Sequence, residues 1–144
     1  MKYLVLVSHG EFAAGLKTAL AMFAGDKIDQ VIAVGLADGK SADDFGVEFR
    51  NALSGINDDD SLVVLADIVG GSPLTTAIGV LDDLGRLNTT PIIGGMNLPM
   101  ALIAVVMKDA LEGDAFVQAV IGEASTAIQQ FKPAAEEADD EDDI

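Results

Sequence analysis

The side chain best suited to chemistry in this chain is His9, the only histidine, which follows an apolar run in the segment LVSHG. An imidazole ordinarily titrates near neutral pH, so it can act as an acid, a base, a nucleophile or a ligand. Asp67 follows a second apolar run, SLVVLA at 61–66. A carboxylate that accepts the Nδ1 proton of a histidine leaves the lone pair of Nε2 facing outward. A pair of His9 and Asp67 would therefore provide a nucleophilic histidine.

A second chemical feature is the segment GGSP at 70–73. Serine is a favoured N-cap and proline a favoured first helical residue, so Ser72 and Pro73 predict the start of a helix with Ser72 as its N-cap. The free backbone N–H groups of a helix N-terminus bind anions. A glycine pair before a helix is more often a plain turn, and an isolated histidine more often structural. Because an imidazole, a carboxylate and an anion site coincide here, we expect Gly71 and Ser72 to hold a phosphoryl group on His9.

Other chemistries fit these residues less well. One histidine and no cysteine cannot supply an ordinary zinc site, so no metal is expected. A hydrolase built on Ser72, His9 and Asp67 is opposed by the motif Gly-Gly-Ser-Pro, because Pro73 has no N–H to offer an oxyanion hole. The chain has neither a Walker lysine motif nor a GxGxxG fingerprint, so no nucleotide cofactor is expected.

The strands and helices that position these residues are predicted from alternating patterns along the sequence. Continuous apolar runs predict buried strands at 3–8, 30–36, 61–66 and 90–93. Helices are predicted from residue 12 to a Gly25 cap, after a Ser41 N-cap, at 73–84 before Gly85, at about 98–108, and from about 114 to 130. Such alternation predicts an α/β fold, a parallel sheet between two helix layers. In these sheets the ligand site lies beyond the carboxyl ends of the strands, where His9, Asp67 and Gly94–Gly95 are expected.

Composition limits the partners and the location of the protein. The 144 residues suffice for one domain, half of them are hydrophobic, and no apolar run approaches the ~20 residues that span a bilayer. No secretory signal and no disulfide framework is recognisable, so a cytoplasmic protein is expected. A net charge of −16 disfavours nucleic acid and anionic lipid and favours basic protein partners.

Part of the negative charge belongs to the C-terminal segment KPAAEEADDEDDI, residues 132–144. It holds seven carboxylates and no periodic apolar residues, so we expect a disordered, solubilising acidic tail after a domain at 1–131. Without those seven carboxylates the remainder still carries a net charge of −9. The predicted domain is therefore acidic in its own right.

Three segments, LVLVSHGEFAAGL, LADIVGGSPLTTA and GGMNLPMAL, together resemble the IIA component of the mannose/fructose/sorbose family of the bacterial sugar phosphotransferase system. The resemblance covers residues 1 to about 131. It implies a four-stranded parallel sheet of order 2-1-3-4 flanked by helices, and a homodimer in which an extra C-terminal strand is exchanged. That strand would fall near 127–132, where TAIQQFK is only a feeble strand signal.

The resemblance also implies a reaction. A phosphoryl group would pass from the carrier HPr to His9, then to a histidine of the IIB component, and finally to sugar entering through the membrane components IIC and IID. His9 matches the phosphorylated histidine of the family, Asp67 its carboxylate partner and Ser72 its phosphate-stabilising serine. Two alternatives stay open: a phosphocarrier subunit that feeds dihydroxyacetone kinase, and a non-catalytic anion-binding regulatory module. The motif GGMNLPM favours the sugar system over the kinase.

Overall fold

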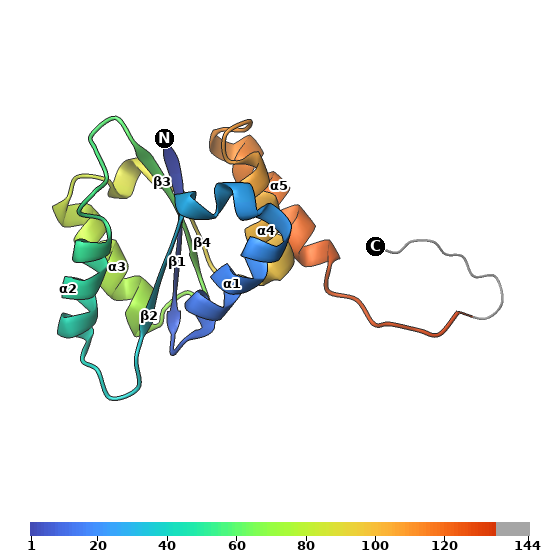
Figure 1. The fold of residues 1–144 in the computed structure, drawn as a ribbon, viewed down its shortest axis with the longest axis horizontal. Helices are drawn as coiled ribbons and strands as arrows, with labels where there is room; N and C mark the ends of the chain where they lie inside the picture. The colour runs from blue at the N-terminus through green and yellow to red at the C-terminus, as the bar shows by residue number, and fades with distance from the viewer. Residues whose placement is uncertain (135–144) are drawn as a thin grey trace.

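The computed structural model describes residues 1–134 as a parallel sheet between two layers of helices (Figure 1). The strands are β1 (Lys2–His9), β2 (Val31–Leu36), β3 (Ser61–Ala66) and β4 (Ile92–Ile93). The α-helices are α1 (Phe12–Ala24), α2 (Ala42–Ala52), α3 (Ser72–Asp83), α4 (Leu98–Met107) and α5 (Gly113–Thr126), with short 3-10 helices η1 (Gly25–Gln30) and η2 (Leu87–Thr89). The strand order is β2-β1-β3-β4, all parallel, which confirms the predicted architecture.

The alternation of side chains along β1 explains why helices cover both faces. Leu4 and Leu6 pack with α1, α4 and α5, whereas Val5 and Val7 pack with α2 and α3. Figure 1 shows these two helix layers on opposite sides of the sheet. All four of these side chains are fully buried, as expected for the central strand of a parallel sheet. The carboxyl ends of the strands therefore meet along one edge, where His9 ends β1.

Several predicted boundaries were wrong. Pairing in β4 is confined to two residues, because η2 extends to Thr89 and Pro91 has no N–H to donate. Helix α5 ends at Thr126 and not near residue 130, since its last buried residue is Ala124 and the following turns would gain no packing. Gly25 is the C-cap residue of α1, as predicted, but its φ of −58° is not left-handed, and η1 begins at the same residue.

The apolar side chains of the first helix do not all face the core. Phe12 and Phe23, which fit the helical spacing, are exposed, and the core contacts come from Ala13, Leu16, Leu20 and Ala24. Most of the expected acidic tail, residues 135–144, lies outside the described residues. Within residues 1–134, no helix is both long enough and apolar enough to cross a membrane.

Candidate functional site

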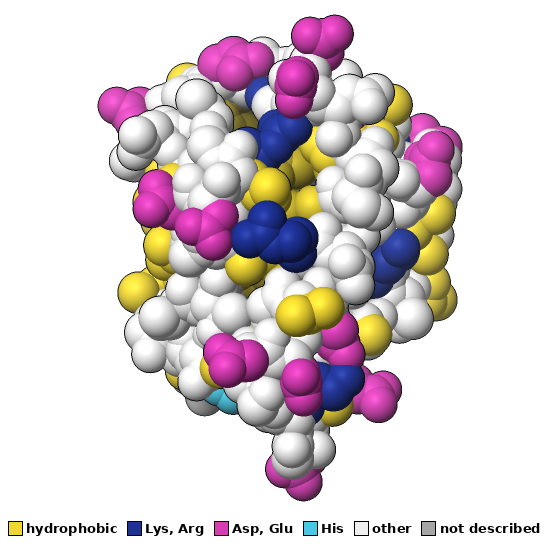
Figure 2. Space-filling view, turned by 90° about the vertical axis from the view of Figure 1, so that its left-hand side faces the viewer, with side chains coloured by type: hydrophobic (Ala, Val, Ile, Leu, Met, Phe, Trp, Pro, Cys, Tyr) yellow, Lys and Arg dark blue, Asp and Glu magenta, His cyan; other side chains and the backbone are white. Residues whose placement is uncertain are grey.

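His9 lies at the carboxyl end of β1, next to Leu36 at the end of β2. The chain turns immediately afterwards at Gly10, whose φ is +55° and whose N–H donates to the Leu36 carbonyl at 2.7 Å. The buried Ser8 Oγ accepts the Ala13 N–H at 2.8 Å and so ties the start of α1 to the end of the strand. These contacts hold the backbone of His9 while its side chain stays 49% exposed. In Figure 2 the histidine is visible at the lower edge of the face seen there.

The Asp67 carboxylate holds both the backbone and the ring of His9. Its Oδ2 lies 2.8 Å from His9 Nδ1 and accepts the His9 backbone N–H at 2.9 Å. Its Oδ1 accepts the backbone N–H of Ile68 at 2.8 Å. An ionised carboxylate only accepts hydrogen bonds, so Nδ1 must be the donor. In the neutral ring this leaves Nε2 as the unprotonated nitrogen.

The same hydrogen bonds stabilise Asp67 as an anion. Its side chain is only 13% exposed, and this burial raises the pKa of the carboxyl. The hydrogen bonds from His9 and Ile68 lower the pKa by more, so it lies below the ordinary value of 3.8. Asp67 therefore carries a full negative charge beside His9 at neutral pH.

The loop from β3 to α3 brings a helix N-terminus against the imidazole. Gly70 has a φ of +94°, and Gly71 is the N-cap of α3, so the prediction that Ser72 forms the cap is wrong. Ser72 is instead the exposed first residue of the helix, followed by Pro73. A Cβ on Gly71 would lie 2.7 Å from Cε1 of His9. Cε1 lies between the two ring nitrogens, so the imidazole lies against the start of this helix, where the backbone N–H groups are free.

The Gly94–Gly95 segment lies at the same edge and is hydrogen-bonded to the backbone of Asp67. The Gly95 N–H donates to the backbone carbonyl of Asp67 at 3.2 Å, and Gly95 has a φ of +79°. A Cβ on Gly94 would lie 2.3 Å from Cγ2 of Val69. Both glycines thus let the segment that follows β4 approach the loop that follows β3.

Sequence reasoning missed Gly35 and Gly10, whose close contact shapes the turn that follows His9. A Cβ on Gly35 would lie 2.0 Å from the Gly10 carbonyl oxygen, so only glycine permits the observed turn after β1. A glycine inside an apolar strand commonly marks such a close approach, and this was the available signal. Gly10 and His9 also line a hollow of about 240 Å³ with the segment from Leu36 to Lys40.

Three exposed apolar side chains come from the segments next to the His9–Asp67 pair. Phe12 is the first residue of α1, and Ile68 and Val69 directly follow Asp67. Exposed apolar side chains that gather at one place commonly mark a contact surface. In the part of the chain that the structure describes, His, Cys, Asp and Glu side chains do not form a group of three or more suited to a metal ion.

Comparison with known proteins agrees with these features. The model of the EIIA-man family, described as "PTS system fructose IIA component", matches residues 3–121. The PTS system fructose-specific EIIA component of Bacillus subtilis (strain 168) is 26% identical over 107 residues, which are 74% of this chain and 70% of that protein.

Solved structures show the same similarity. The phosphotransferase system component EIIA from Streptococcus agalactiae superposes with a TM-score of 0.75 at 25% identity, covering 90% of this chain and 97% of the other. The mannose/sorbose specific IIA subunit from Enterococcus faecalis has a TM-score of 0.78 at 22% identity, covering 94% and 98%. The second similarity concerns the fold alone.

Proposed function

Because this chain belongs to the EIIA-man family, the mannose/fructose/sorbose class of phosphotransferase-system IIA components, we propose that His9 is its phosphoryl-carrying residue. Members of this class are phosphoryl carriers in sugar transport. In the proposed cycle, His9 accepts the phosphoryl group of phospho-HPr and passes it to the IIB component, which serves sugar uptake through IIC and IID. The observation that carries the proposal is the 2.8 Å contact between His9 Nδ1 and Asp67, which leaves Nε2 unprotonated on a half-exposed ring.

The transfer is an in-line displacement at phosphorus. The Nε2 lone pair of His9 forms a bond to phosphorus while the P–N bond of the donor phosphohistidine breaks, and the donor imidazole leaves with that electron pair. The second transfer repeats the step with a IIB histidine as nucleophile and His9 as leaving group. Such chemistry depends on positioning and on stabilisation of negative charge.

The charges around His9 suit this cycle. Asp67 keeps the Nδ1 proton in place and stabilises the positive charge that develops on the ring as Nε2 attacks. The same carboxylate repels the incoming phosphoryl group. We assign the compensating attraction to the backbone N–H groups at the start of α3, next to Gly71 and Ser72.

Partner proteins would bind over this edge of the sheet. Phe12, Ile68 and Val69 offer apolar contact beside His9. The acidic charge of the chain favours basic surfaces on HPr and IIB and speeds their encounter. A carrier between these partners would act in the cytoplasm.

The test is incubation with phosphoenolpyruvate, enzyme I and HPr, followed by detection of acid-labile phosphate. Wild-type protein should be phosphorylated on Nε2 of His9, and His9→Gln should fold but stay unlabelled. Labelled protein is then offered to IIB and to the dihydroxyacetone kinase subunits, and transfer to IIB alone is expected. Failure of the wild-type protein to label would favour the regulatory module, and phosphate on His9→Gln would refute the assignment of His9.

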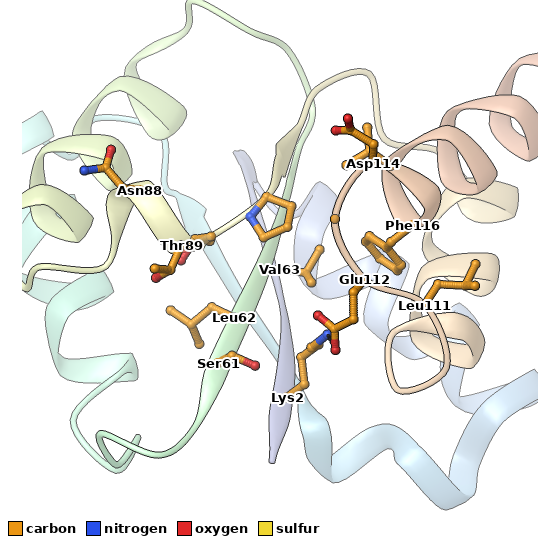
Figure 3. A pocket seen from close by; sticks show the side chains of 14 residues that line it. Lys2, Ser61, Leu62, Val63, Asn88, Thr89, Leu111, Glu112, Asp114 and Phe116 are labelled. Carbon is orange, nitrogen blue, oxygen red and sulfur yellow. Dashed lines mark hydrogen bonds and ion pairs between the residues drawn. The ribbon is translucent and has the colours of Figure 1, made fainter.

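We also propose a homodimer, formed at the outer edge of β4. This short strand pairs only with β3 among the described residues. Two hollows, of about 360 and 340 Å³, follow one another along it from Thr90 to Gly95, both bordered by Val117 of α5. Figure 3 shows the first hollow, between Val63 of β3 and the start of α5, with Lys2 joined to Glu112 at its border.

The segment 127–132 of a second copy is the proposed occupant of this edge. It follows α5 directly, and its apolar side chains Ile128 and Phe131 are 77% and 84% exposed. Light scattering should report a dimer at micromolar concentration. Replacing Ile128 and Phe131 with aspartate should give a monomer, whereas Met22→Asp, equally exposed on α1, should not. Removal of residues 133–144 should leave assembly unchanged, and a monomeric wild-type protein would refute the proposal.

A further inference from the structure

Lys40 is the one basic side chain that lines the hollow containing His9. The hollow measures about 240 Å³ and is bordered by His9, Gly10 and the segment from Leu36 to Lys40. The other charged residue in its lining, Asp38, is negative. Lys40 is thus the positive side chain in this lining, against the negative Asp38 in the same lining and Asp67, which contacts the His9 ring.

The backbone of Lys40 is fixed beside this hollow. Its N–H donates to the Ala37 carbonyl at 3.0 Å, closing a turn in which Gly39 has a φ of +84°. The next residue, Ser41, caps α2 by accepting the Asp44 N–H at 3.0 Å. The backbone of Lys40 is therefore held between the end of β2 and the start of α2, so a change of partner would require only rotation about the bonds of its long side chain.

The ammonium of Lys40 is paired with Glu48 on α2. The hydrogen bond and the charge of Glu48, with a smaller contribution from Asp44, raise the pKa of Lys40 above 10.5. Lys40 is thus charged at any pH at which the protein works. The pair is solvent-exposed, and exposed ion pairs contribute little to stability, so the ammonium can leave Glu48 at little cost.

We propose that Lys40 exchanges partners, binding Glu48 when His9 is free and the phosphoryl oxygens when His9 is phosphorylated. This inference rests on the function proposed above. A phosphoryl group offers nearly two negative charges and three strong acceptor oxygens, against one charge on Glu48. Lys40 thereby offsets the repulsion from Asp38 and Asp67 and stabilises the phosphorylated state. Glu48 acts as a competitor for the same ammonium.

The experiment measures the equilibrium of phosphoryl transfer between HPr and this protein, and the hydrolysis rate of the isolated phosphoprotein. Lys40→Met should shift the equilibrium toward phospho-HPr by about fivefold and speed hydrolysis, with a smaller shift at high salt. Glu48→Gln should shift it about twofold the other way, because it releases the ammonium. The double variant should behave like Lys40→Met. Lys17→Met on α1 is the matched control and should match wild type.

Two outcomes would overturn the inference. If Glu48→Gln keeps its effect in the absence of Lys40, the two side chains do not compete as proposed. If Lys40→Met raises only the KM for phospho-HPr and leaves the equilibrium and the hydrolysis rate unchanged, Lys40 contacts the partner protein and not the phosphoryl group. A wild-type protein that cannot be phosphorylated would refute the proposed function itself, which is a separate result.

Discussion

Replacing Asp67 with asparagine should slow phosphorylation of His9 by about 10²- to 10³-fold. The carboxylate accepts three hydrogen bonds, two on Oδ2 from the backbone and ring of His9 and one on Oδ1 from the Ile68 N–H. Asparagine has one oxygen and one NH₂ group, so one of these positions must become a donor. In one orientation its NH₂ faces the Ile68 N–H, and in the other it faces both His9 groups.

The two orientations give a lower and an upper limit for the loss of phosphorylation rate. If the oxygen still faces His9, the ring keeps its tautomer, and the rate falls because no negative charge stabilises the ring as Nε2 attacks. A hydrogen bond to a charged group contributes about 1.5–3 kcal/mol, which corresponds to about 10- to 150-fold in rate. If the NH₂ faces Nδ1, the proton moves to Nε2 and the nucleophile is lost; in a comparable His–Asp pair this costs roughly four orders of magnitude. Because the ring of His9 is half exposed, water can satisfy part of the loss. The expected value therefore lies between these limits.

Rapid-quench measurement of labelling by phospho-HPr gives the rate, and calorimetry gives the affinity for HPr separately. Asp82→Asn, which removes the same charge from an exposed position near the end of α3, is the matched control and should transfer at the wild-type rate. The affinity for HPr should be nearly unchanged in both variants. Transfer by Asp67→Asn at the wild-type rate would show that another group orients His9 and that the assigned pairing has no catalytic role.

Three further predictions follow from the same contacts. Gly71→Ala should reduce labelling about tenfold or more, because its Cβ would lie 2.7 Å from His9 Cε1, whereas Gly79→Ala in α3 meets no atom within 4 Å and should leave labelling unchanged. Ser72→Ala should reduce labelling by less than about tenfold, since the backbone donors of α3 remain. The stability advantage of wild type over Asp67→Asn, measured by urea unfolding, should be full above pH 3.8 and disappear as the pH falls through the lower folded pKa of Asp67; an advantage that grows in acid would contradict the assigned shift.

The sheet could be predicted from sequence because its signals are local. Buried parallel strands are continuous apolar runs, and the run at 61–66 coincides with β3. The ends of elements were less predictable, since they depend on tertiary packing. The helix signal continues past Thr126, but the core ends at Ala124, so α5 stops there. Phe12 fits the apolar face of α1 by spacing, yet it is the first residue of the helix and is exposed.

The location of the site could also be predicted in part from the sequence. The rule that ligands bind at the carboxyl ends of parallel strands placed His9 and Asp67 at one edge, and the structure brings them within 2.8 Å. Their catalytic roles remain predictions. The anion site was expected at Gly71 and Ser72, but with Ser72 as the cap. Gly71 holds that position because a side chain there would overlap the imidazole, a constraint that helix-capping preferences do not contain.

Close approaches between backbone segments could not be predicted from the sequence. The turn after β1 requires that position 35 lack a Cβ, and the segment after β4 requires the same of Gly94, which faces Val69. Each contact joins residues that are about 25 apart in the chain, so no local pattern encodes it. In the sequence, only the glycines themselves indicate these contacts. A glycine inside an apolar strand, such as Gly35, is therefore best interpreted as a sign that another backbone segment crosses there, and in this protein that segment is the turn that carries the histidine.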